Sequence, residues 1–155
     1  NKGVNPSGCF VLIGTITKET RIIAVCEGVA TGAAIHKATG WPVVCALFAD
    51  NLLPVSIALC DEPRLADKKF IFMADNDEGA PEHGNKGVEC ACYAAAHVNS
   101  MLLVPNFRRY PCTDMLSDMD DLYLLGDIQE LRYQIMKGLY LTDMVHDVCG
   151  RFCLI

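Results

Sequence analysis

The sequence predicts one α/β domain built around a mainly parallel sheet. Short apolar segments rich in β-branched and aromatic residues alternate with segments of helical composition, which is the pattern of successive βαβ units. Acidic residues directly follow two of the apolar segments, and open parallel sheets bind ligands at the carboxyl ends of their strands. We therefore expect about four parallel strands flanked by helices, with an optional further strand on the N-terminal side.

The first half of the chain supplies three of the expected strands. Residues 9–13 and 21–26 are apolar and bounded by turn-forming residues. A helix is expected over residues 30–39, with Gly40 as its C-terminal cap. Residues 42–48 are again apolar and predict the next buried strand.

The middle of the chain continues the alternation. Asp50 or Asn51 is suited to cap a helix over residues 52–59. Residues 69–74 predict a buried strand that ends at an acidic segment. The small side chains of residues 87–98 predict a helix packed closely on the sheet.

The last part of the chain completes the domain. We expect a short strand at residues 101–104 and a long acidic loop over residues 105–122. Asp127 and Glu130 have the spacing of a capping box, which predicts a final helix.

Composition limits the class of protein. The chain has 155 residues, of which 52% are hydrophobic, so it can bury a substantial core. Residues 1–138 are expected to form the domain, and residues 139–155 a tail or short helix. No apolar run approaches the roughly 18 residues of a membrane helix. The net charge of −6 argues against gripping nucleic acid by bulk charge.

The nine cysteines do not predict a disulfide framework or a zinc site. Their number is odd, and the sequence contains no Cys-x-x-Cys motif. Most lie in apolar segments, where a thiol behaves as a small hydrophobic group. We expect a reduced, cytoplasmic protein without a membrane partner.

The first candidate site follows the strand at residues 21–26. A carboxylate at a strand end, here Glu27, suits a general base or a metal ligand, and Gly28 allows a ligand to approach the backbone. Thr31 and the amides that begin the next helix are suited to hold a phosphate. The alternative is a turn acid beside a helix-capping hydroxyl.

The second candidate site follows the strand at residues 69–74. Asp75 and Asp77 are alternate residues and present two carboxylates to one side, which suits Mg²⁺. The alternative is an ordinary Asp-Asn-Asp turn. Asp118 and Asp121 in the acidic loop are expected near the same edge, and Lys86 is suited to meet a phosphate.

These motifs together resemble a family. The motifs are Cys-Glu-Gly-Val-Ala-Thr-Gly (26–32), Met-Ala-Asp-Asn-Asp (73–77) and Asn-Lys-Gly (85–87). In this order and spacing they resemble the Toprim domain of primases, topoisomerases and nucleases. Residues 38–44 and 51–55 further resemble the Toprim domain of plasmid- and phage-type DNA primases. Residues 117–122 approximate the last primase motif, with Ser, Met and Asp in place of Thr, Phe and Asn.

The resemblance implies particular roles. Glu27 matches the Toprim glutamate, a general acid or base that also helps bind metal. Asp75 and Asp77 match the pair that coordinates Mg²⁺ (or Mn²⁺), and Asp118 and Asp121 match the late acidic motif. The implied reaction is nucleotidyl transfer, in which a primer 3′-hydroxyl attacks a nucleotide and displaces pyrophosphate.

The resemblance also implies partners and leaves alternatives. A primase acts on single-stranded DNA template and nucleoside triphosphates, and we expect this chain to work with the remaining primase and helicase domains of a longer parent protein. One alternative is another Toprim chemistry, that of a nuclease or topoisomerase. The other is a non-catalytic α/β docking module.

Overall fold

The computed structural model describes residues 6–76, 84–110 and 116–149, and within them a five-stranded sheet. The strands are β1 (Val11–Ile13), β2 (Ile22–Cys26), β3 (Val43–Cys45), β4 (Lys69–Met73) and β5 (Met101–Leu103). Their order across the sheet is β1-β3-β2-β4-β5. The last four are mutually parallel, and β1 pairs antiparallel with β3. The α/β fold and the additional N-terminal strand expected from the sequence are confirmed.

The order of the parallel strands reverses beside β2. From β2 the chain passes through a helix to β3 on one side, and then crosses to β4 on the other side. Connections that leave neighbouring strands in opposite directions open a crevice at their carboxyl ends, where α/β proteins bind ligands. The topology therefore predicts a ligand site at the carboxyl ends of β2 and β4.

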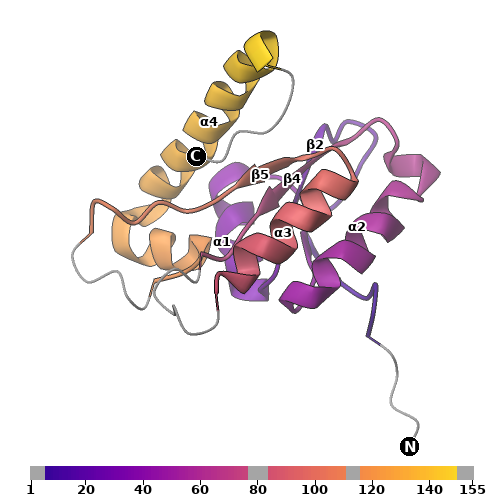
Figure 1. The fold of residues 1–155 in the computed structure, drawn as a ribbon, viewed down its shortest axis with the longest axis horizontal. Helices are drawn as coiled ribbons and strands as arrows, with labels where there is room; N and C mark the ends of the chain where they lie inside the picture. Colours follow the sequence, from indigo (N-terminus) through magenta and orange to yellow (C-terminus); the bar gives the residue numbers. More distant parts are fainter. Residues whose placement is uncertain (1–5, 77–83, 111–115, 150–155) are drawn as a thin grey trace, which may run out of the picture.

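Helices cover both faces of the sheet (Figure 1). They are α1 (Val29–Thr39), α2 (Leu52–Cys60), α3 (Lys86–His97) and α4 (Met119–Cys149), with short turns η1 (Ala49–Asn51) and η2 (Pro63–Leu65). Helices α1 and α4 pack together on one face, and α2 and α3 on the other. Alternate residues of β2 enter the two cores, with Ala24 and Cys26 toward α1 and α4, and Ile23 and Val25 toward the opposite face.

Small residues allow the helices to approach the sheet closely. A Cβ atom on Gly32 of α1 would overlap the Cys45 sulfur of β3. Helix α3 buries Ala91, Ala94 and Ala95 against the sheet. Gly40 ends α1 in the left-handed conformation with φ 74°, as its position after residues 30–39 predicted.

Asn51, one of the two residues expected to cap α2, forms hydrogen bonds elsewhere. Asn51 occupies the N-cap position but its side chain does not cap the helix. Instead its amide oxygen accepts from Gly8 N at 2.7 Å, and its nitrogen donates to Cys9 O and Ala46 O at 2.8 and 2.6 Å. Asn51 is 1% exposed, and its side chain joins three backbone groups, of which the Ala46 carbonyl lies in the buried core.

Helix α4 differs most from expectation. It begins at Met119, inside the loop expected to extend to residue 122, and continues to Cys149 without a break at residue 138. The helical backbone is interrupted at Asp127, where φ is 66°. Asp127 Oδ1 accepts from Gln129 N at 2.6 Å and from Glu130 N at 3.4 Å, so the helix start predicted at Asp127 is confirmed as the N-cap of the second half. The C-terminal part of α4 extends away from the two layers of helices (Figure 1).

None of the helices in the described part of the chain is both long and apolar enough to cross a membrane.

Candidate active site

Glu27 and Asp75 follow adjacent parallel strands at the same edge of the sheet. Strands β2 and β4 pair in register, with Cys26 opposite Met73, so the residues that follow each strand leave the sheet side by side. Both acids are half-buried, and Asp75 Oδ1 is shielded from solvent. The structure thus places two of the predicted site residues after neighbouring strands, at the point where the strand order reverses.

The N-terminus of α1 opens at this edge. Its N-cap is Gly28, which has no side chain to cap the helix, and the first turn contains no acidic residue. A Cβ atom on Gly28 would lie 3.1 Å from Thr31 Oγ1, so the glycine also leaves room for the threonine hydroxyl. The first backbone N–H groups of a helix without a side-chain cap are suited to receive an anion.

Thr31 connects α1 to the start of α4. Its hydroxyl donates to Asp118 Oδ2 at 2.6 Å, and the threonine is 1% exposed. Nearby, Asn76 N donates to Ser117 O at 2.5 Å, which ties the segment after β4 to the same part of the chain. Asp118 therefore lies at the edge that carries Glu27 and Asp75, as the sequence predicted.

Asp118 and Asp121 form a reciprocal cap on α4. Asp118 Oδ1 accepts from the N–H groups of Asp120 and Asp121 at 2.8 and 2.9 Å. In return, Asp121 Oδ2 accepts from Ser117 N at 2.8 Å and from Asp118 N at 3.3 Å. This is a capping box with Asp in the place of Glu. The carboxylate of Asp121 is engaged in capping the start of the helix, and Asp118 is the member that also reaches α1.

Helix α3 begins against the backbone of Asp75. Gly87 is buried, and a Cβ atom there would overlap the Asp75 carbonyl oxygen. Asn85 caps α3 by accepting from Val88 N at 3.3 Å, and its side chain donates to Asn76 Oδ1 at 2.6 Å. Two asparagines and a glycine therefore set the direction of the chain after β4. The sequence contained Asn76 between the two predicted metal ligands, but only the folded chain reveals its partner.

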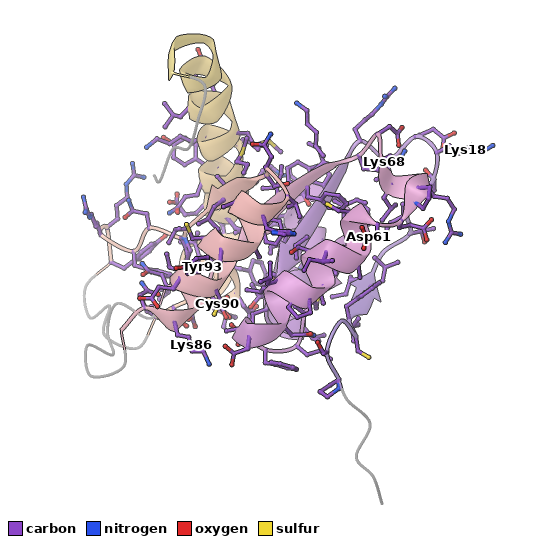
Figure 2. The ribbon with its side chains drawn as sticks, turned by 45° about the vertical axis from the view of Figure 1, so that its right-hand side comes forward. Lys18, Asp61, Lys68, Lys86, Cys90 and Tyr93 are labelled. Carbon is purple, nitrogen blue, oxygen red and sulfur yellow. The ribbon has the colours of Figure 1, made fainter. Side chains whose placement is uncertain are left out.

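Lys86 lies on the α2 side of the edge. Its ammonium pairs with Asp50 Oδ2 at 2.6 Å, and both side chains are exposed. This hydrogen bond raises the pKa of Lys86, with further contributions from the charges of Asp50 and, more weakly, Cys90 and Glu27. Lys86 and Cys90 lie along the start of α3 in Figure 2. The lysine expected to meet a phosphate is thus held by Asp50 in this structure.

Cys26 is a residue of this edge that sequence reasoning assigned only to the core. Its thiol donates to Gly28 O at 3.3 Å and to Cys45 Sγ at 3.9 Å. The hydrogen bond to Cys45 and complete burial raise the pKa of Cys26, and the charges of Asp75 and Asp118 raise it further. The charges of Asp75 and Asp118 thus act on the same buried thiol, whereas the charge of Glu27 acts on Lys86 and Cys90 at the start of α3.

The chemistry of the carboxylates fits a hard cation. Mg²⁺ retains several waters and is commonly held by one or two carboxylates together with substrate phosphates. Glu27 and Asp75 supply such oxygen donors at one edge. No group of three or more His, Cys, Asp or Glu side chains suited to a metal occurs within residues 6–76, 84–110 and 116–149. Asp77, the other member of the predicted pair, lies outside the described residues.

The chain matches no protein-family model, no curated protein and no solved structure. Its function is therefore inferred from the site.

Proposed function

We propose that this chain is the metal-binding, Toprim-like catalytic domain of a DNA primase, which joins nucleotides on a single-stranded DNA template. The observation that supports the proposal is that Glu27 and Asp75 follow neighbouring parallel strands at the edge where α1 begins with a glycine N-cap. Carboxylates with a helix N-terminus provide two complementary functions, since the acids bind a cation and the amides bind a phosphate.

Each residue has a distinct task in the proposed reaction. Glu27 accepts the proton of the attacking 3′-hydroxyl as general base. The backbone amides after Gly28 bind the phosphate. Thr31, expected to share this task, is buried and donates its hydroxyl to Asp118, so it holds the first turn of α1 in place instead. Asp75 and Asp77 would hold Mg²⁺ or Mn²⁺, which when bound neutralises phosphate charge and favours ionisation of a coordinated hydroxyl.

Lys86 takes part only if it leaves Asp50. Both partners of that ion pair are exposed, and exposed ion pairs contribute little stability. An incoming triphosphate offers the ammonium a more highly charged partner. In the proposed reaction, Lys86 therefore exchanges Asp50 for the substrate.

The charge of the chain bears on its partners. With a net charge of −6, this chain is poorly suited to hold a long template by electrostatic attraction alone. We propose that the remaining primase and helicase domains of the parent protein supply most of the affinity for template, in the cytoplasm of the cell.

Primer synthesis by the parent protein tests the proposal. We expect Glu27→Gln and Asp75→Asn to lower Mg²⁺-dependent incorporation of labelled ribonucleotides on single-stranded DNA by roughly a hundredfold or more, the scale of losing acid–base catalysis. Asp61→Asn is the matched control, because Asp61 is an exposed acid at the far end of α2 (Figure 2). Equal synthesis by all three variants would show that the site is not catalytic.

The same reaction mixtures distinguish the two alternatives. A nuclease or topoisomerase would cut or relax DNA with the same dependence on Glu27 and Asp75, because the carboxylates serve hydrolysis as well as transfer. A docking module would show neither primer synthesis nor cleavage in the parent protein and no effect of Mg²⁺.

A further inference from the structure

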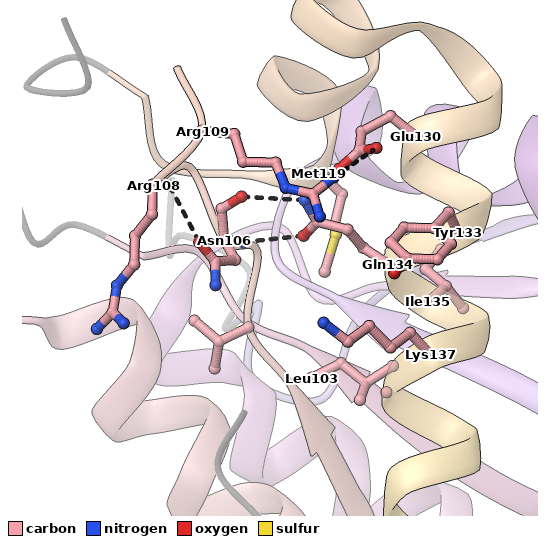
Figure 3. A pocket seen from close by; sticks show the side chains of 12 residues that line it. Leu103, Asn106, Arg108, Arg109, Met119, Glu130, Tyr133, Gln134, Ile135 and Lys137 are labelled. Carbon is pink, nitrogen blue, oxygen red and sulfur yellow. Dashed lines mark hydrogen bonds and ion pairs between the residues drawn. The ribbon is translucent and has the colours of Figure 1, made fainter. Parts of the chain in front are cut away.

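A cavity lies next to the candidate active site, between the end of β5 and helix α4 (Figure 3). Its volume is about 170 Å³, and Leu103 and Met119 contribute to its wall. Met119 directly follows Asp118, and Leu103 ends the strand beside β4. The cavity therefore adjoins the candidate site along the chain, through Met119 next to Asp118, and across the sheet, through β5 next to β4.

The rim of the cavity is positively charged in an acidic chain. Arg108, Arg109 and Lys137 line it, and among the described residues of its lining Glu130 is the one acid. Glu130 lies 4.0 Å from Arg109, a distance that orients the guanidinium while leaving its side chain 69% exposed. Three cations against one acid make this cavity a local exception to the net charge of −6. Such a rim favours an anionic ligand.

An exposed aromatic ring lies among these cations. Tyr133 is 49% exposed, and the charged groups of Arg109 and Lys137 lie 6.0 and 5.9 Å from the centre of its ring. A tyrosine face beside arginine and lysine is the combination that binds single-stranded nucleic acid, because every base can stack on the ring while its phosphate meets a cation. A free inorganic anion has no aromatic group that could stack on the ring.

Hydrogen bonds hold the wall of the cavity in place. Gln134 Oε1 accepts from Asn106 N at 3.0 Å, and Gln134 Nε2 donates to Asn106 O at 3.0 Å. Gln134 Nε2 also donates to Glu130 Oε1 at 2.9 Å. Two hydrogen bonds between Asn106 and Gln134 therefore hold the loop after β5 against α4. A wall fixed before binding loses little freedom when a ligand is bound.

The size of the cavity distinguishes a strand from a small molecule. Pockets that enclose a whole small ligand have volumes of roughly 300–1,000 Å³. The volume here, about 170 Å³, admits one phosphate or one base and leaves the rest of a nucleotide outside. We propose that this cavity is a contact point for single-stranded nucleic acid passing the active-site edge. The choice of DNA as the strand rests on the proposed function.

Binding of a fluorescent oligothymidine to this chain, measured by anisotropy at several salt concentrations in EDTA, tests the proposal. Arg108→Ala with Lys137→Ala is compared with Lys18→Ala and Lys69→Ala, which are exposed at the amino end of the sheet. Both double variants remove two positive charges. We expect only the first to weaken binding, and to reduce the slope of log affinity against log salt by about 1.4, since each phosphate contact on a single strand contributes about 0.7.

The ring has its own pair of variants. Tyr133→Leu is expected to weaken binding roughly tenfold by removing the stacking surface, and Tyr133→Phe to retain it. A duplex of the same length should bind more weakly than the single strand, because paired bases are not available to stack.

Three results would overturn the proposal. They are equal loss in the two double variants, equal binding of duplex and single strand, and competition by thymidine monophosphate as strong as that by the oligonucleotide. The last would indicate a small-molecule site. Because binding is measured without metal, its outcome is separate from that of the proposed reaction. Absent primer synthesis with intact, charge-dependent binding would contradict the proposed function and leave this site standing.

Discussion

At the scale of single residues, Thr31 connects two helices through one hydroxyl. It is 1% exposed, and its bond to Asp118 at 2.6 Å joins the first turn of α1 to the first residue of the α4 cap. A hydrogen bond to a charged acceptor contributes about 1.5–3 kcal/mol, more than a bond between neutral groups. The hydroxyl therefore has a structural function, which is to join α1 to the start of α4.

Thr31→Val tests this function. Valine has nearly the same shape but no donor, so Asp118 Oδ2 loses its partner within the protein. We expect the free energy of unfolding to fall by about 1–3 kcal/mol, measured by urea denaturation. Thr31→Ser keeps the hydroxyl and is the control, with a smaller loss from the missing methyl group. A Val variant as stable as the Ser variant would mean that the bond contributes nothing net.

At the scale of elements, the start of α4 depends on two carboxylates. Asp118 and Asp121 satisfy backbone N–H groups in both directions, which fixes where the helix begins. Asp120, between them, has a different environment. Burial and the charges of Asp118 and Asp121 raise the pKa of Asp120, so its ionised form is disfavoured in the folded protein.

Replacing each acid by alanine separates these environments. Asp121→Ala is expected to lower the free energy of unfolding by about 1 kcal/mol, the usual cost of losing a cap. Asp120→Ala removes the same charge from the same turn, so the effect on the helix dipole is matched. Because the folded state binds the Asp120 proton more tightly, ionised Asp120 reduces stability as the pH rises through its native pKa. At neutral pH its replacement should therefore cost less than that of Asp121, as thermal denaturation will show. Equal losses of stability in the two variants would indicate that the Asp121 carboxylate acts only through its charge and not through its hydrogen bonds.

At the scale of the whole molecule, the candidate site exists only because distant segments meet. Glu27, Asp75 and Asp118 come from the ends of two strands and the start of the last helix. Two helical layers hold these segments, and Leu131 and Ile135 of α4 are buried beside α1 and the sheet. A metal that binds across such segments would stabilise the folded state, because the unfolded chain does not present the same ligands.

Divalent metal is therefore expected to raise the thermal midpoint. At a Mg²⁺ or Mn²⁺ concentration about a hundred times Kd, binding adds about 2.7 kcal/mol, or roughly 5–10 °C for a chain of this length. Asp75→Asn should lose this increase, and Asp61→Asn should keep it. Na⁺ at matched ionic strength controls for screening of the negative net charge. An equal shift in the Asp75 and Asp61 variants would assign the effect to charge screening rather than to the site.

The sequence by itself determined the alternation of strands and helices, because burial imposes a short apolar run on a strand and a small or periodic pattern on a helix. It also placed Glu27 and Asp75 at strand ends, since both acids interrupt apolar runs. Chain order and tertiary contacts were needed to reveal that these strands are neighbours. Local spacing alone could not predict the buried partners of Asn51 or the start of α4 at Met119. Both depend on contacts between segments far apart in the sequence, such as Gly8 with Asn51 and Thr31 with Asp118. Such contacts form because a buried polar atom needs a hydrogen-bond partner, which a distant segment can supply.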